Sequence, residues 1–236
     1  MTLQNKTAFI TGGANGIGKA TAKKFLQAGA NVFVFELSPE RIEQFQAEAE
    51  GGNLACYQGD VGNESDVKAA FRSCAETFGG VDILLNNAGI GIPSPDLSVA
   101  ELDVFDKMVN TNMRGVFLCT REALKIMKPR KSGHILTLIS MAGQRTNPGA
   151  PLYCASKFGA RGINSGLADQ VLKDGIKVTD INPGPVNSDY WGDRDVPREK
   201  FLSVDDVADV IFFAVTTPEH VVIREVNFDS VAWLTK

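Results

Sequence analysis

A short apolar run that opens into glycines constrains the fold of this chain more than any other stretch. Thr7–Thr11 has the length and character of a buried strand, and the glycine-rich segment Thr11–Gly18 follows it. A helical pattern then runs over Gly16–Gln27, with Gly29 placed where helices commonly end. Backbone N–H groups of such a turn and of the helix start face an anion, so the stretch predicts a phosphate site.

The next apolar run, Asn31–Glu36, ends in a carboxylate about twenty residues beyond the glycines. An acid at this place binds the ribose hydroxyls of a dinucleotide, although a strand-end charge in water is the alternative. The glycine spacing is G-x-x-x-G-x-G, and a plain glycine-rich turn is the alternative there. Ser38 and Pro39 suit the N-cap and first position of a following helix.

Strand and helix patterns alternate along the rest of the chain. The sequence predicts further strands over 54–58, 81–85, 134–139, 176–181 and 222–228. It predicts three helices over 63–78, 153 to about 173 and 203 to about 216. A further helix is predicted to start at a capping box formed by Ser98 and Glu101 and to continue to Met127, with a break near Asn112. This alternation predicts an α/β fold with a doubly wound, mostly parallel sheet, formed by residues 1–236 as a single domain.

Polar and small residues follow several of the predicted strands. They are Glu36, Asp60, Asn87, Ser140 and Pro183. Ligands of parallel sheets bind beyond the carboxyl ends of the strands, so these positions predict one cofactor site rather than unrelated loops. Small residues at such ends also suit tight turns, which is the alternative for 86–89.

Tyr153 and Lys157 stand four residues apart in a predicted helix. Side chains at this spacing lie on one face, and a lysine beside a tyrosine favours the phenolate. The pair therefore suits proton transfer near neutral pH, although a surface helix with a tyrosine and a lysine is the simpler alternative.

Composition excludes several functional classes. The net charge of −4 argues against a nucleic-acid surface, and no apolar run is long enough for a membrane span. Four scattered cysteines and two histidines disfavour a metal site, a disulfide framework and a Ser-His-Asp hydrolase. With no secretory or transit signal visible, the expected location is cytoplasmic.

Three motifs stand out in the chain: Thr11-Gly12-x-x-x-Gly16-Ile17-Gly18, Asn86-Asn87-Ala88-Gly89 and the series Asn112, Ser140, Tyr153, Lys157. With these motifs in this order, the sequence resembles the short-chain dehydrogenase/reductase family over nearly the whole chain. The resemblance implies a Rossmann fold with Tyr153 as general acid and base, Lys157 lowering its pKa, Ser140 holding the substrate oxygen and Asn112 supporting a proton path. It implies cofactor contacts from Gly12, Asn15, Gly16, Ile17, Gly18, Glu36, Leu37, Asp60, Val61, Asn87, Ala88, Gly89, Tyr153, Lys157, Pro183, Gly184, Val186 and Ser188.

Glu36 favours NAD, because its charge would repel the 2′-phosphate of NADP; Arg41 or Lys19 could oppose this. The expected function is NAD-dependent interconversion of a small secondary alcohol and its ketone. The chain's ending resembles the hydroxy-acid and amino-acid branch, which usually prefers NADP, so an NADPH-dependent carbonyl reductase is one alternative. A non-catalytic NAD(H)-binding redox sensor is another. The resemblance also implies a homodimer or homotetramer.

The segment from about 188 to 202 is short for a substrate loop. It contains Arg194 and Arg198, either of which could bind an anionic substrate group. A solvated loop is the alternative.

Overall fold

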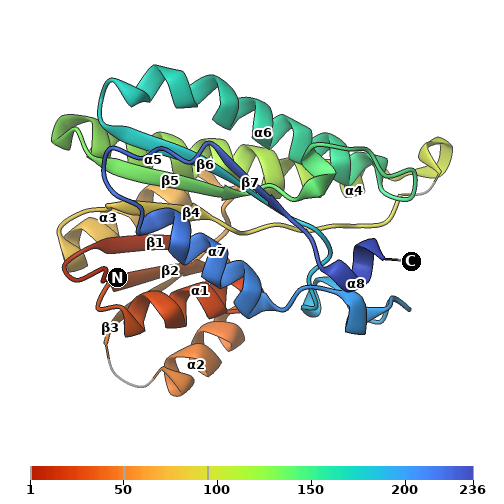
Figure 1. Cartoon of the computed structure of the whole chain (residues 1–236), viewed down its shortest axis with the longest axis horizontal. Helices are drawn as coiled ribbons and strands as arrows, with labels where there is room; N and C mark the ends of the chain where they lie inside the picture. The colour runs from red at the N-terminus through yellow and green to blue at the C-terminus, as the bar shows by residue number, and fades with distance from the viewer. Residues whose placement is uncertain (1, 50–51, 95, 236) are drawn as a thin grey trace.

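The chain forms one seven-stranded parallel sheet covered by helices on both faces (Figure 1). The computed structural model describes residues 2–49, 52–94 and 96–235. The strand order is β3-β2-β1-β4-β5-β6-β7, so the winding reverses between β1 and β4. Chain connections leave the sheet in opposite directions at this point and open a crevice there. The predicted doubly wound sheet is confirmed.

The strands are β1 (Thr7–Thr11), β2 (Asn31–Glu36), β3 (Asn53–Gln58), β4 (Ile83–Asn86), β5 (Gly133–Leu138), β6 (Ile176–Pro183) and β7 (Glu225–Phe228). The helices are α1 (Gly16–Gln27), α2 (Pro39–Glu48), α3 (Glu64–Phe78), α4 (Leu102–Val109), α5 (Gly115–Arg130), α6 (Pro151–Leu172), α7 (Val204–Val215) and α8 (Val231–Leu234). A π-helical turn, Asn110–Arg114, joins α4 to α5 at the predicted break.

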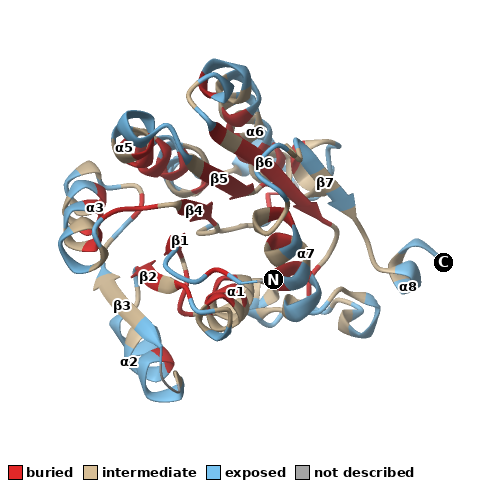
Figure 2. Cartoon of the chain, turned by 60° about the vertical axis from the view of Figure 1, so that its left-hand side comes forward, coloured by how far each residue is buried: buried red, intermediate tan, exposed pale blue. Residues whose placement is uncertain are grey.

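Two apolar layers hold the sheet between its helices. One lies between the sheet and α1, α2 and α7, and the other lies between the sheet and α3, α5 and α6. Phe9 on β1 is fully buried and stacks on Phe33 at 5.2 Å and on Phe71 at 4.1 Å between ring centroids. Figure 2 shows the central strands buried and the edge strands β3 and β7 largely not. Strands covered on both faces read as continuous apolar runs, which explains the sequence pattern.

Side-chain caps start several helices where the sequence predicted them. The Ser38 hydroxyl accepts from Arg41 N at 3.2 Å, and Ser203 forms a capping box with Asp206. The predicted capping box at Ser98 is wrong. The Asp96 carboxylate accepts from Ser98 N at 2.9 Å and caps a short 3-10 turn, Leu97–Val99, so α4 begins only at Leu102 and without a side-chain cap.

Some predicted boundaries also shift. β7 starts at Glu225 rather than Val222, and the short helix α8 follows it without having been predicted. In Figure 1, α8 lies at the same end of the sheet as the 3-10 turns of residues 188–202. None of the helices in the described part of the chain has the length and apolar character to cross a membrane.

Candidate functional site

A cavity of about 1230 Å³ opens at the carboxyl ends of the strands. Of the twenty residues predicted for cofactor contact or catalysis, eighteen line this cavity. They are Gly12, Asn15, Gly16, Ile17, Glu36, Leu37, Asp60, Val61, Asn87, Ala88, Gly89, Ser140, Tyr153, Lys157, Pro183, Gly184, Val186 and Ser188.

 The two remaining predicted residues, Gly18 and Asn112, do not line it.

Two glycines of the turn, Gly12 and Gly18, are packed too closely for a side chain. A Cβ on Gly12 would lie 3.1 Å from Ala88 Cα, and a Cβ on Gly18 would overlap the Gly12 carbonyl oxygen. Gly18 packs against Gly12 and Asn87 and does not line the cavity, so its contact with the cofactor stays a prediction. No side chain caps the N-terminus of α1 within the described residues, which leaves the backbone donors of its first turn for an anion.

Asn87 ties the end of β4 to this turn. Its Nδ2 donates to Thr11 O and to Gly12 O, each at 2.9 Å, and Thr11 Oγ1 accepts from the Asn87 and Ala88 N–H groups at 3.0 Å. The segment 86–89 thus sets the position of the glycine turn as well as lining the cavity.

The Glu36 carboxylate is buried at the end of β2 and lines the cavity. It accepts from Leu37 N at 3.0 Å, from Ser38 N at 3.3 Å and from Ala14 N at 3.4 Å. These backbone donors hold a negative charge beside the glycine turn, where the ribose of a dinucleotide would lie. Arg41 also lines the cavity, whereas Lys19 pairs with Glu48 at 2.6 Å.

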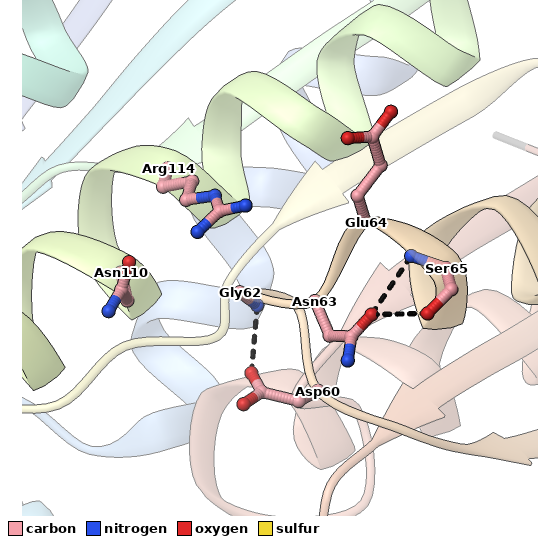
Figure 3. Close-up of a pocket in the computed structure, with 7 residues that line it drawn as sticks. All are labelled: Asp60, Gly62, Asn63, Glu64, Ser65, Asn110 and Arg114. Atoms are coloured by element: carbon pink, nitrogen blue, oxygen red, sulfur yellow. Dashed lines mark hydrogen bonds between the residues drawn. The ribbon is translucent and has the colours of Figure 1, made fainter.

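Asp60 borders a second, polar hollow of about 460 Å³ beside the main cavity (Figure 3). Asp60 Oδ1 accepts from Gly62 N at 2.8 Å, and Asn63 Oδ1 caps α3 by accepting from Ser65 N at 2.9 Å. In Figure 3 the Arg114 guanidinium faces this hollow from the π-helical turn. The side-chain oxygens of Asp60 and Asn63 accept hydrogen bonds from the backbone of the same loop. We therefore assign this hollow to the surface of the loop after β3 and not to a separate site.

Tyr153, Ser140 and Lys157 meet at the other end of the main cavity. Lys157 Nζ lies 5.9 Å from the centroid of the Tyr153 ring and donates to Leu138 O at 2.7 Å. Burial lowers the pKa of Lys157 to about 8, so the amine is still mainly charged at neutral pH.

The phenol of Tyr153 is held in its neutral form. Burial raises its pKa well above the usual value; the neighbouring Tyr190 adds to the rise, and a hydrogen bond with Ser140 lowers it. Lys157 is not among the groups that shift this pKa, so the expectation that it lowers the pKa of Tyr153 stays a prediction.

Ser140 has a backbone conformation that side chains rarely adopt. Its φ is +95° and its ψ is 155°, a region populated almost only by glycine. Its hydroxyl accepts from Ala142 N at 3.2 Å, which gives this backbone N–H group a partner. The same hydroxyl also forms a hydrogen bond with Tyr153. Strain of about 1–3 kcal/mol persists only where the surroundings impose it, and such residues concentrate in functional sites.

Asn112 is fully buried in the π-helical turn. Its amide exchanges hydrogen bonds with the backbone of Ile90, both at 2.8 Å, and donates to Ser156 at 2.9 Å. A Cβ on Gly89 would lie 3.3 Å from Asn112 Oδ1 and 3.4 Å from Lys157 Nζ. Asn112 therefore stands near Lys157 but does not line the cavity, and its direct contacts are structural.

The family model for short chain dehydrogenases matches residues 6–198. This chain belongs to the short chain dehydrogenase family. An uncharacterized oxidoreductase of Staphylococcus aureus (strain USA300) is 30% identical to it over 225 residues, which are 95% of this chain and 97% of the relative. The fold and the match together make the chain an oxidoreductase with a Rossmann-type nucleotide-binding site.

Two solved structures are similar to this short chain dehydrogenase over almost their whole length. A 3-ketoacyl-(acyl-carrier-protein) reductase from Brucella melitensis, complexed with NADH, has a TM-score of 0.91 and 28% identity, covering 98% of this chain and 99% of its own. An alcohol dehydrogenase from the archaeon Thermococcus sibiricus, complexed with 5-hydroxy-NADP, has a TM-score of 0.89 and 26% identity, covering 96% and 97%. Both coenzyme types thus occur among similar folds.

Sequence reasoning missed several residues of the dehydrogenase cavity. Tyr190 and Trp191 line it from the segment 188–202, here called the substrate loop, and Trp233 lines it from α8. Arg194 of the same loop, which was predicted as a candidate for binding an anion, also lines it. Met141, Ala142 and residues 145–150 form another part of its wall. The loop was predicted from its composition, but no periodic or spacing signal indicated which of its side chains turn inward. Among the described residues, no group of histidine, cysteine and acidic side chains could hold a metal ion.

Proposed function

We propose that this short chain dehydrogenase interconverts a small secondary alcohol and its ketone with NAD as coenzyme. One observation carries the proposal: Tyr153, Ser140 and Lys157 line the same cavity as the glycine turn and the Glu36 carboxylate. A proton-handling group and a dinucleotide cradle within one cavity are what hydride transfer between a coenzyme and an alcohol requires.

The residues present fit a dinucleotide. The close packing of Gly12 against Ala88 and the uncapped first turn of α1 leave backbone donors for a pyrophosphate. Glu36 would accept from the adenosine ribose hydroxyls, and Lys157 would donate to the ribose near the nicotinamide. The bound nicotinamide would supply the hydride acceptor and donor chemistry.

NAD is proposed over NADP because of the charge on Glu36. A 2′-phosphate beside this buried carboxylate would place like charges in contact, which costs several kcal/mol. Arg41 lines the cavity and could offset this, whereas Lys19 is engaged by Glu48. A comparison of kcat/KM with NAD and with NADP tests the assignment, and a clear preference for NADP would reject it.

Tyr153 would handle the proton. In ketone reduction its neutral phenol, favoured by burial, would donate to the carbonyl oxygen while Ser140 donates to the same atom. In alcohol oxidation the phenolate would accept the hydroxyl proton, and the Lys157 ammonium would stabilise that phenolate. Tyr153→Phe is expected to remove turnover by at least about a hundredfold and to retain coenzyme binding.

A second candidate is an NADPH-dependent carbonyl reductase of hydroxy or amino acids. Arg194 favours an anionic substrate, because it lines the cavity and forms no salt bridge among the described residues; its guanidinium donates to Trp191 O at 2.7 Å and to Tyr190 O. Arg198 also bonds to the loop, donating to Ser188 O at 3.3 Å and to Gly192 O at 2.5 Å, but it does not line the cavity. A panel of neutral and carboxylate-bearing alcohols and ketones with both coenzymes separates the two candidates. Arg194→Met should then weaken only the acids, with Arg198→Met as the matched control.

The rival from another class is an NAD(H)-binding sensor without turnover. Coenzyme binding with no activity on the whole panel would favour it, and turnover lost in Tyr153→Phe but kept in Tyr57→Phe would exclude it. Tyr57 is a suitable control because it lies on β3 outside the cavity.

We also propose that the enzyme works in the cytoplasm as a homodimer or homotetramer. The four cysteines are unpaired, which suits a reducing compartment. Phe105 on α4, Phe117 on α5 and Phe158 on α6 are each at least 40% exposed, which suits burial against a second copy. Light scattering of the purified chain tests the assembly, and a monomer at micromolar concentration would reject it.

A further inference from the structure

Two tyrosines face each other in the main cavity. The ring of Tyr190, from the substrate loop, lies 5.8 Å from the ring of Tyr153 between centroids, and both line the cavity. The Tyr190 hydroxyl lies against Gly91, where a Cβ would overlap it. Tyr190 therefore reaches across the cavity from the loop to the segment after β4, in front of the predicted catalytic phenol.

The substrate loop holds Tyr190 in this place. Its two ends are joined where Asn187 N donates to Leu202 O at 2.8 Å and Leu202 N donates to Pro185 O at 2.9 Å. Trp191 Nε1 donates to Val186 O at 2.8 Å, and the Tyr190 ring packs edge-on against Trp191 at 5.3 Å. The position of Tyr190 is thus built into the loop rather than being that of a free side chain.

Aromatic contacts continue outward from this pair. Trp191 packs on Phe201 at 5.1 Å, and Phe201 packs on Trp233 of α8 at 5.5 Å. The Arg194 guanidinium lies 4.9 Å from the centroids of both the Tyr190 and Trp191 rings. A movement of Tyr190 would therefore be transmitted to two tryptophans, which gives an optical signal for it.

We propose that Tyr190 is the specificity-determining residue of the pocket, because its phenol occupies the place in front of Tyr153 that a substrate oxygen must take. This inference rests on the proposed function, in which Tyr153 bonds to the substrate oxygen. A substrate must displace the Tyr190 hydroxyl, so small substrates with strong hydrogen-bonding oxygens are favoured over bulky ones.

The electrostatics around Tyr153 agree with this geometry. The groups that face it are Ser140, Lys157, Cys154 and Tyr190. After burial, which is the largest cause, Tyr190 contributes to the raised pKa of Tyr153, whereas Ser140 opposes it. Removing the Tyr190 hydroxyl should therefore lower the pH at which Tyr153 loses its proton.

The experiment compares Tyr190→Phe with the wild type and with Tyr57→Phe, using the full chain. The chain has three tyrosines, so Tyr57→Phe is the matched loss of a phenol outside the cavity. In Tyr190→Phe the KM for a small ketone or alcohol should fall about two- to tenfold, the effect of one competing hydrogen bond, with kcat little changed. Tyr190→Ala should in addition admit bulkier ketones.

A second readout needs no turnover. Ultraviolet absorbance of tyrosinate is followed against pH in Tyr57→Phe and in the double variant Tyr57→Phe/Tyr190→Phe, whose only remaining tyrosine is Tyr153. The midpoint of the Tyr153 signal should fall when Tyr190 is replaced. If the wild type is inactive on every substrate, the proposed function fails, but this titration still decides whether Tyr190 acts on Tyr153.

An unchanged or higher KM in Tyr190→Phe, or an unchanged titration midpoint, would overturn the inference and leave Tyr190 as a packing residue of the loop. Thermal melting of each variant shows whether the fold is retained, and Tyr190→Phe keeps the ring that packs on Trp191.

Discussion

Replacing Glu36 by glutamine tests the coenzyme assignment most directly. The substitution keeps the shape of the side chain and one acceptor oxygen, and it removes the charge that Ala14 N, Leu37 N and Ser38 N hold in place. The amide nitrogen cannot accept a hydrogen bond, so the longest of these contacts, from Ala14 N at 3.4 Å, is the one expected to be lost. The change therefore acts mainly on the electrostatic part of the discrimination.

The magnitude follows from two effects. Hydrogen bonds to a charged acceptor are about twice as strong as neutral ones, so NAD should lose ~1 kcal/mol of binding, or about fivefold. The repulsion of a 2′-phosphate, several kcal/mol, should largely disappear, so kcat/KM with NADP should rise about a hundredfold. The ratio of kcat/KM for NAD over NADP should then fall by about two to three orders of magnitude.

The assay is initial-rate kinetics with each coenzyme, followed by absorbance of the reduced nicotinamide. Glu43→Gln is the matched control, because it removes the same charge from the exposed surface of α2. An equal change of the ratio in Glu43→Gln would indicate a general field effect. A ratio that does not move in Glu36→Gln would refute the assignment of Glu36 to the ribose.

Two further predictions concern stability and the glycine turn. Burial raises the pKa of Asp180 to about 6 in the folded chain, above the pKa of an aspartate in the unfolded chain. The folded state therefore favours the protonated carboxyl, and the stability that this form contributes is lost as pH rises through about 6. Asp180→Asn should therefore raise the free energy of unfolding by ~1–3 kcal/mol at about pH 8 and by little at about pH 4, as measured by denaturant titration. A Cβ on Gly18 would overlap Gly12 O, so Gly18→Ala should abolish measurable NAD binding in calorimetry. Gly162→Ala, with nothing within 4 Å of its Cβ, should bind normally and melt at the same or a higher temperature.

Much of the site could be predicted from sequence because its residues follow strands. Glu36, Asn87 and Ser140 each come at or directly after a buried apolar run, and parallel strands bring their carboxyl ends to one edge. The order of the runs was therefore enough to place these side chains in one cavity. Tyr153 and Lys157 needed only the helical spacing of four residues to share a face.

What the sequence could not determine depends on contacts between distant segments. The neutral form of Tyr153 is set by burial and by Tyr190, which comes from a loop whose side-chain directions have no periodic signal. The turn around Ser98 was mispredicted because Asp96, two residues earlier, competes for the same N–H group. Gly18 belongs to the motif but does not line the cavity.

The sequence by itself determined the alternation of strands and helices, the glycine turn and the identity of the acid at Glu36, since these depend on local pattern and on strand order. Only the tertiary structure decided that Tyr190 stands in front of Tyr153 and that Arg194, not Arg198, lines the cavity. The physical reason is that periodicity fixes which face of a regular element is buried, whereas a loop side chain takes its direction from the elements packed around it.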